Sequence, residues 1–420
     1  MADVQRAYEL AVEQYAESGV NAADALRALE RIPLSIHCWQ GDDVGGFERP
    51  DAALGGGGIQ VTGNYPGKAR TVQELRADLS ELYSLLPGKH RLNLHASYGE
   101  FGGRTVDRDE IEPSHYDGWI SWCREHGLGL DFNSTFFSHP RADDGFTLSS
   151  KDSATREFWM EHLRRARAVS AHIGAEVGST CIHDIWLPDG MKDYPADRLG
   201  LRETLTRALD EVFQTEYPAK AMKDALESKL FGIGSEAFVV GSHEFYMGYA
   251  LTRNKMICID SGHFHPMEVI ADKISSLLLF TDELLLHVSR PMRWDSDHIV
   301  LFNDELRMLC QEIVRTDRIN DIHIGLDFFD ATLNRVGAWA IGARSTLKGL
   351  LAALLEPKKR LVEAEEAGDY FTRLALLEEQ RTLPLGAVWD HYCENAGVPT
   401  DAELIARVTD YEKRVLRARR

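Results

Sequence analysis

The sequence predicts an α/β protein built on a closed (β/α)8 barrel, or TIM barrel, with N-terminal helices and a C-terminal helical extension. Three observations support this fold. Eight short apolar runs alternate with helical runs between residues 34 and 355, which favours parallel strands joined by right-handed crossovers. Eight is also the number of strands that closes such a barrel. Finally, side chains that can bind metal follow several successive strands, whereas the alternative, an open doubly wound sheet, usually has its site at one crevice.

The predicted elements follow in order along the chain. Residues 1–32 contain two helical patterns, 3–17 and 22–31, with a cap signal at Asn21 and Asp24 and a break at Pro33. The strand-like runs are 34–39, 91–98, 128–132, 180–186, 225–231, 255–260, 284–289 and 322–328. The helical runs between and after them are 72–86, 116–126, 153–173, 201–213, 245–252, 269–280, 304–316 and 334–355.

Three regions are expected from this order. After the N-terminal helices, residues 33–357 form the barrel, because a chain of 420 residues suits one barrel of about 250 residues or more with appendages. Residues 358–420 show no strand pattern, and Pro384 and Pro399 divide them into about three helices. This extension is either an oligomer clasp or a cap on the barrel. Residues 41–70, with four glycines at 55–58, are either a mobile lid or a plain surface loop.

Composition excludes several classes of protein. The net charge of -19 leaves no basic face, which argues against nucleic-acid binding and against a nuclease with clustered metals. The chain contains no apolar run of about 18 residues, so no membrane span is expected. The N-terminus lacks a secretory signal, and six cysteines without a CxxC pair are typical of reduced core residues. We therefore expect a cytoplasmic protein.

Acidic and imidazole side chains gather at the predicted strand ends. Residues 256–259 lead to Asp260, Gly262 permits a turn, and His263 follows closely enough to share a cation with Asp260. The other candidates at strand ends are Glu227, His287 and Asp327. In the loop beyond His287, Asp295 and Asp297 have the two-residue spacing that points both carboxylates the same way in an extended chain.

These groups sort into two predicted ion sites. One ion takes Glu227, Asp260, His287 and Asp327, and the second takes His263, Asp295 and Asp297, with Asp260 as a candidate bridge. Carboxylate oxygens with imidazole suit Mn²⁺, Mg²⁺ or Co²⁺ better than cysteine-rich zinc chemistry does. Two such ions can hold neighbouring oxygens of a polyol and polarise the carbonyl between them.

Each candidate also has an ordinary structural interpretation. An aspartate after a strand often caps a helix, a histidine in a strand is often part of the core, and a loop carboxylate is often only solvated. So many such groups at one barrel edge are not explained in this way. His95, at the end of the second strand, is either a sugar-binding or proton-shuttling residue or a core histidine. Trp39, Trp186 and Trp294 are either pocket walls or core residues.

Long stretches of the chain resemble the L-rhamnose isomerase family over essentially the full length. They are HCWQGDD (37–43), GNYPGKAR (63–70), RLNLH (91–95), WLPDGMKD (186–193), ESKLFGIG (227–234), GHFHP (262–266), HVSRP (287–291), RWDSDH (293–298) and HIGLDFFD (323–330). Stretches of this length are far more specific than a short motif.

The resemblance implies a homotetramer and a manganese-type divalent requirement, with two ions per subunit and Mg²⁺, Co²⁺ or Zn²⁺ as alternatives to Mn²⁺. It also implies the reversible conversion of L-rhamnose to L-rhamnulose, the first step of rhamnose catabolism, by hydrogen transfer between C1 and C2. His263, Asp295 and Asp297 match the ligands of the catalytic ion, whereas Glu227, Asp260, His287 and Asp327 match those of the structural ion.

The residues expected to act on the sugar follow from the same comparison and from strand parity. Lys229 shares a strand face with Glu227 and matches the lysine near the substrate carbonyl, where it can stabilise a developing alkoxide. Lys229, Asp295 and Asp297 are the expected catalytic residues, and His95, Trp186, Lys229 and Asp327 the expected substrate contacts.

Two alternatives to the isomerase remain at this point. A sugar epimerase on the same barrel needs two acidic bases on opposite faces of one carbon, and a non-enzymatic sugar-binding protein uses its ions only to hold the fold. The sequence also leaves open whether hydrogen moves as hydride or through an enediol.

Overall fold

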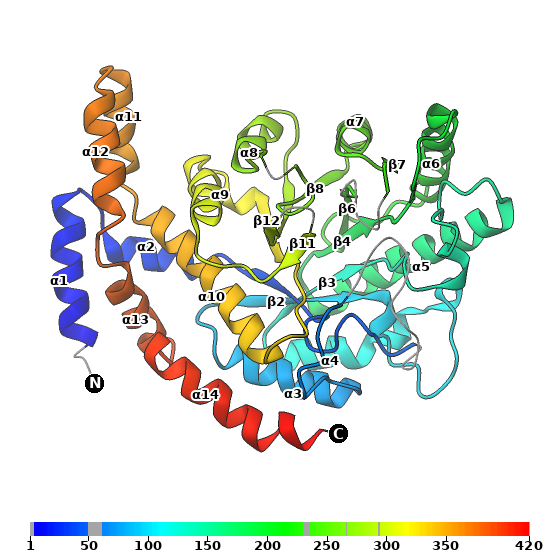
Figure 1. Cartoon of the computed structure of the whole chain (residues 1–420), viewed down its shortest axis with the longest axis horizontal. Coiled ribbons are helices and arrows are strands. Elements are labelled where there is room, and N and C mark those ends of the chain that lie inside the picture. The colour runs from blue at the N-terminus through cyan, green and yellow to red at the C-terminus, as the bar shows by residue number, and fades with distance from the viewer. Residues whose placement is uncertain (1–3, 49–60, 230–235, 266, 293–294, 420) are drawn as a thin grey trace.

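A computed structural model gives the fold (Figure 1). It describes residues 4–48, 61–229, 236–265, 267–292 and 295–419, and at 295–297 the backbone alone. The glycine run at 55–58 and Trp294 therefore lie outside the described residues.

Eight of the described strands close into a parallel barrel in the order β1-β12-β9-β8-β6-β4-β3-β2, with β2 returning to β1. This confirms the predicted TIM barrel and excludes the open sheet. The barrel strands are β1 (Leu34–His37), β2 (His90–His95), β3 (Gly129–Asn133), β4 (Cys181–Trp186), β6 (Met222–Glu227), β8 (Met256–Asp260), β9 (Leu284–Val288) and β12 (Ile322–Leu326).

Two short antiparallel strand pairs lie beyond the carboxyl ends of the barrel strands, and the sequence analysis did not predict either. One pairs β5 (Gly190–Met191) with β7 (Phe238–Val239), and the other pairs β10 (Arg290–Met292) with β11 (Asp295–His298). Their few residues have too little alternation to be told from loop sequence. Both strand pairs are formed by loops on the barrel face where TIM-barrel sites are found.

The helices cover the barrel and extend past it (Figure 1). They are α1 (Val4–Glu17), α2 (Ala22–Leu29), α3 (Val72–Tyr83), α4 (Asp117–Glu125), α5 (Ser153–Val177), α6 (Arg198–Val212), α7 (His243–Arg253), α8 (Ala271–Leu278), α9 (Asp304–Arg315), α10 (Arg335–Leu354), α11 (Lys358–Glu366), α12 (Tyr370–Gln380), α13 (Leu385–Asn395) and α14 (Asp401–Arg414). The predicted cap at Asn21 is confirmed, because its side chain accepts from the backbone N–H groups of Ala23 and Asp24. Among the described residues, none of these helices has both the length and the hydrophobicity needed to cross a membrane.

The C-terminal extension differs from the prediction of about three helices. It contains four, α11 to α14, because the first predicted segment is broken at Gly368, whose φ of +69° lies in the left-handed region that ends helices. Helix α1 packs against α13 and α2 against α10, so the N-terminal helices lie on one flank of the barrel beside α10 and part of the C-terminal extension (Figure 1).

The inside of the barrel has an apolar side and a polar side. Ile182, Ala225, Met256, Cys258 and Leu285 form a buried cluster on β4, β6, β8 and β9. The strands opposite carry buried polar groups inside the barrel, among them Ser35, Asn93, Asp131 and Asn133. A TIM-barrel interior is usually filled by bulky branched side chains. The polar side therefore departs from the usual packing of this fold.

Helix α5 packs closely on the barrel at Gly174. A Cβ on Gly174 would overlap the carbonyl oxygen of Ala221, which is backbone and has little room to move. Gly174→Ala is therefore expected to destabilise the protein by about 1–3 kcal/mol, the usual cost of overpacking. The matched control is Gly248→Ala in α7, where a Cβ meets nothing within 4 Å. That change is expected to stabilise the helix by up to about 1 kcal/mol. Denaturant unfolding of both variants checks the pair, and equal stability of the two would contradict the packing argument.

Candidate metal centre

Four of the predicted ligands meet at the carboxyl end of the barrel. Glu227 ends β6, Asp260 ends β8, His287 is the penultimate described residue of β9, and Asp327 directly follows β12. One ligand atom from each lies within 4.8 Å of all the others. The first predicted ion site is therefore assembled by strands that are far apart in sequence but adjacent in the barrel.

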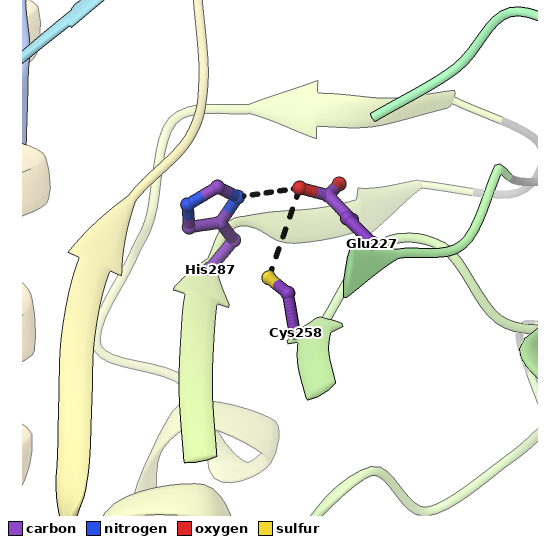
Figure 2. A group of neighbouring side chains, drawn as sticks. All are labelled: Glu227, Cys258 and His287. Carbon is purple, nitrogen blue, oxygen red and sulfur yellow. Dashed lines mark hydrogen bonds and ion pairs between the residues drawn. The ribbon is translucent and has the colours of Figure 1, made fainter. Parts of the chain in front are cut away.

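Glu227 lies at the middle of this cluster. Its Oε1 is 2.9 Å from His263 Nδ1 and its Oε2 is 2.9 Å from His287 Nδ1. His287 Nδ1 is also 3.8 Å from Asp327 Oδ2. Figure 2 shows the Glu227 carboxylate directed between His287 and Cys258, whose Sγ is 3.7 Å from Oε2. His263 was predicted to bind the second ion. It thus contacts Glu227, a predicted ligand of the first ion.

Asp260 has one satisfied and one unsatisfied oxygen. Oδ1 accepts from the backbone N–H of Gly262 at 2.6 Å and from the hydroxyl of Ser289 at 3.0 Å. Oδ2 is buried and has no hydrogen-bond partner among the described residues. A buried carboxylate oxygen left without a partner costs free energy unless a cation or a proton satisfies it.

The charges at the centre are strongly coupled. Burial favours a neutral carboxyl, but His287 and His263 hold the pKa of Glu227 well below its usual range. Burial opposes a charged imidazole, yet the carboxylates of Glu227, Asp184 and Asp327 raise the pKa of His287 well above its usual value. Burial and the neighbouring acids raise the pKa of Asp327 to about 7. The pocket therefore favours positive charge among its carboxylates.

These residues fit a divalent cation. The donor set is three carboxylates and an imidazole, all buried or half-buried, with an unpartnered oxygen on Asp260. Oxygen donors with an imidazole suit Mn²⁺, Mg²⁺ and Co²⁺. Glu227, Cys258 and His287 form a second candidate group, but burial and the Glu227 charge raise the pKa of the Cys258 thiol, which keeps it protonated.

The cluster forms one wall of a cavity of about 60 Å³. The sequence-predicted residues on its lining are Trp39, His95, Trp186, Glu227, His263, His287 and Asp327. Trp39 and Trp186 thus lie on the wall of this cavity, and their contact with a sugar stays a prediction. The His95 ring is 4.7 Å from the Trp39 ring, and its Nδ1 lies 3.1 Å from the Thr135 hydroxyl. Burial, with the charge of Arg108, lowers the pKa of His95 to about 3, so that its ring is neutral at physiological pH.

Sequence reasoning missed two groups of this site. Asp184, on β4, also lines the cavity, and burial and the charge of Glu227 raise its pKa well above the usual value. The signal was present, because Asp184 is two residues before Trp186 and shares its strand face. Cys258 was assigned to the core, although it stands two residues before Asp260 on the same strand.

The expected position of Lys229 needs a correction. The prediction extended the strand from 225 to 231, but β6 ends at Glu227, so strand parity does not carry through to Lys229. Its ammonium donates to the Pro188 carbonyl at 2.5 Å and pairs with the Glu236 carboxylate. Lys229 is fully buried there and is not among the residues that line the cavity. Its catalytic role stays a prediction.

The second predicted ion site is described only in part. Asp295 and Asp297 belong to β11, where Asp295 is paired with Met292 of β10, but their side chains lie outside the described residues. The antiparallel pairing does place both residues on an extended strand, the backbone conformation in which two residues spaced by two share a face. The ligand set of this ion stays a prediction.

Solved structures include proteins with a similar fold. A solved structure titled as L-ribulose 3-epimerase matches with a TM-score of 0.50 at 13% identity, covering 79% of this chain and 97% of that chain. At this identity the likeness concerns the fold alone. The chain is thus a TIM-barrel protein with a carboxylate and imidazole centre at the carboxyl ends of its strands.

Sequence similarity identifies the family. The family model described as L-rhamnose isomerase (RhaA) matches residues 2–419. L-rhamnose isomerase of Rhodopirellula baltica is 57% identical over 417 residues, which cover 99% of this chain and 97% of that protein. The enzyme of Escherichia coli K12 is 53% identical over 416 residues, covering 99% of each chain. The chain belongs to the L-rhamnose isomerase family, which confirms the resemblance and its assignment as an isomerase.

Proposed function

We propose that this protein is a divalent-metal-dependent aldose–ketose isomerase that converts L-rhamnose to L-rhamnulose in rhamnose catabolism, by hydrogen transfer between C1 and C2. The observation that carries the proposal is the group of Glu227, Asp260, His287 and Asp327 beside a cavity at the carboxyl end of the barrel. An epimerase or a sugar-binding protein is less consistent with a chain 57% identical to an L-rhamnose isomerase.

The proposed cofactor is a pair of Mn²⁺ ions, with Mg²⁺, Co²⁺ or Zn²⁺ as alternatives. Glu227, Asp260, His287 and Asp327 would hold one ion, and His263, Asp295 and Asp297 the other. When bound, such ions polarise a sugar carbonyl and offset the negative charge of the acidic cluster. The unpartnered Oδ2 of Asp260 and the buried carboxylates around it support the first of these sites.

The cavity walls suit an open-chain sugar. Trp186 and Trp39 offer apolar faces, and the indole N–H of Trp39 donates to Asp327 Oδ1 at 2.9 Å, which orients that carboxylate. The neutral ring of His95 can accept or donate one proton at the cavity wall, as ring opening requires. We assign His95, Trp186, Lys229 and Asp327 to substrate binding, and Lys229, Asp295 and Asp297 to catalysis.

The proposed role of Lys229 requires a local rearrangement. Its ammonium must leave the Pro188 carbonyl and the Glu236 carboxylate before it can donate to a sugar oxygen. Burial lowers the pKa of Lys229, while Glu236 opposes that shift and favours the charged form. The cationic form is the one that stabilises developing negative charge on a carbonyl oxygen.

Assembly and location are also proposals. A cytoplasmic homotetramer is supported by two features: the six cysteines are free and buried, as in reducing compartments, and helices α11 and α12 extend beyond the barrel (Figure 1). The residues of α12 with exposed apolar side chains are Tyr370, Phe371 and Leu374, at 66%, 80% and 56% exposure. Such a surface suits contact between subunits. Light scattering of the purified protein tests the tetramer, and a monomer would contradict it.

Removal of metal is the direct test of the proposed activity. After treatment with EDTA, ketose formation from L-rhamnose should fall to background and return when Mn²⁺ is added, because the acidic cluster otherwise lacks its counter-ions. In Asp295→Asn, added Mn²⁺ should not restore turnover. Turnover unchanged by EDTA, or an unaffected variant, would contradict the proposal. Label from deuterated solvent at C1 or C2 of the product distinguishes an enediol from a hydride shift.

The same experiment has a readout that does not depend on turnover. A ligand that binds only the folded state stabilises it by about 2.7 kcal/mol at a hundredfold excess over Kd. Mn²⁺ should therefore raise the Tm of the EDTA-treated protein. A sugar-binding protein whose ions only hold the fold would show the same rise in Tm but would form no ketose.

A further inference from the structure

A second cavity of about 250 Å³ lies inside the barrel below the metal centre. Its lining runs from the middle of the barrel to the amino-terminal ends of the strands and includes Ser35, Asn93, Asn133, Asp184 and Gly325. Bulky branched side chains usually fill this space in a TIM barrel. An internal cavity with so many polar groups therefore calls for an occupant.

Small side chains on the polar side of the barrel create this space. In the strand ladder, Ser35 of β1 pairs with Gly325 of β12 on one side and with Arg91 of β2 on the other. A Cβ on Gly325 would lie 3.0 Å from the His287 ring, so the glycine keeps the space below that histidine open. Ile182 and Leu285 of the apolar cluster also line this cavity.

Three oxygens on the lining of this cavity have no hydrogen-bond partner among the described residues. They are Asn93 Oδ1, Asn133 Oδ1 and Asp184 Oδ1, on side chains that are 3%, 4% and 3% exposed. Leaving a buried polar atom without a partner costs free energy. Buried water commonly satisfies such atoms with about three hydrogen bonds, and a cavity of this size has room for several molecules.

The lower end of the cavity reaches the protein surface. Its lining there includes Arg31 and Asn320, which are exposed, and Thr180, which is partly exposed. Just inside, Arg91 donates to Asp131 at 2.7 and 2.8 Å, and the Ser35 hydroxyl donates to the same carboxylate at 2.6 Å. Charged and polar groups thus continue from the surface to the unpartnered oxygens.

The upper end meets the metal centre. Asn133, Asp184 and His287 line both this cavity and the one beside the ligand cluster, so they form a shared wall. The sugar is expected to enter from the opposite face, past Trp39 and Trp186. The cavity inside the barrel therefore reaches the metal centre from the side that a bound sugar would leave free.

We propose that this cavity holds a column of water that runs from the amino-terminal face of the barrel to Asp184 and His287, and that gives the metal centre a second route to solvent. Asn93, Asn133 and Asp184 are its binding groups, and Gly325 keeps it open. Occupancy by water follows from the barrel alone, whereas exchange with the metal centre rests on the proposed function.

A crystal structure at high resolution tests occupancy directly. Wild-type crystals should show ordered water bonded to Asn93, Asn133 and Asp184, in a continuous chain that reaches the lower surface. Asn93→Leu, which keeps the branched shape of the side chain but removes the acceptor, should interrupt the chain of water, and Asn395→Leu on the exposed part of α13 should not. An empty or collapsed cavity in the wild type would overturn the proposal even if the variant did not fold.

Exchange of water with the metal centre is tested on Mn²⁺-loaded protein in which a non-reacting sugar alcohol occupies the cavity beside the ligand cluster, past Trp39 and Trp186. Oxygen-17 relaxation should show that solvent water still reaches the bound ion in the wild type, and that exchange is severalfold slower in Asn93→Leu. Equal exchange in both proteins would overturn the second route. Failure of Mn²⁺ to bind would contradict the proposed function instead, while the crystallographic result would still decide the water column.

Discussion

Glu227→Gln is expected to lose ketose formation from L-rhamnose by at least about a thousandfold, because a bound ion supplies several kcal/mol and each 1.36 kcal/mol is a tenfold change in rate. Glu227 is the residue on which the centre depends most, since its two oxygens contact His263 and His287 separately, each at 2.9 Å. The amide keeps the shape of the side chain but carries no charge and presents only one acceptor oxygen. Mn²⁺ binding, measured by calorimetry, should be lost together with turnover.

The matched control is Glu283→Gln. Like Glu227, Glu283 is a carboxylate paired with a histidine, His323. It is only partly buried, also pairs with Lys223, and lies at the opposite end of the barrel strands. This variant should bind Mn²⁺ and turn over L-rhamnose like the wild type. If Glu227→Gln bound the metal normally, or if both variants lost activity equally, the assignment of the centre would be wrong.

Arg167→Ala is expected to produce the largest loss of stability, about 3–5 kcal/mol, because it breaks a buried ion pair and leaves a buried charge behind. Arg167 donates to both oxygens of Asp224 at 3.1 Å, and to the backbone carbonyls of Val212 and Thr215 at 2.9 and 2.8 Å. Both side chains of the pair are 2% exposed. After the substitution, Asp224 keeps the Lys255 ammonium and the His183 ring, whose pKa burial lowers, as partners among the described residues.

Arg164→Ala on the same helix is the control. Arg164 pairs with Glu157 and Glu211 at 2.8 Å but is 30% exposed, so its removal should cost no more than about 1 kcal/mol. Denaturant unfolding at equal protein concentration compares the two variants, since assembly also affects stability. Similar losses for the two arginines would contradict the claim that burial makes the Arg167 pair important.

The loss of stability in Arg167→Ala is expected to depend on pH in a definite direction. Burial opposes ionisation, but His183, Arg167 and Lys255 hold the pKa of Asp224 below its usual value. A carboxyl whose pKa is depressed by folding stabilises the protein above its unfolded pKa of about 3.9 and loses that contribution as the pH falls. The difference in stability between wild type and Arg167→Ala should therefore be largest near neutral pH and should narrow below about pH 4.

The barrel and most of the acidic cluster could be predicted from the amino-acid sequence. Eight apolar runs separated by helical patterns predicted the closed sheet, because parallel strands need helical crossovers. Each ligand at a strand end was identifiable because the carboxyl ends of all barrel strands meet on one face, so Glu227, Asp260, His287 and Asp327 had to be near one another.

The surroundings of those ligands depend on contacts between distant parts of the chain. Strand β6 ends at Glu227, and Lys229 beyond it contacts Glu236 and the Pro188 carbonyl. Pro188 is far from Lys229 in the sequence, so no local pattern reports that contact. The inclusion of Asp184 in the site, and the polar cavity below it, follow from which strands face each other across the barrel. Strand periodicity gives the face of each side chain, but the closure of the sheet sets its partners across the interior.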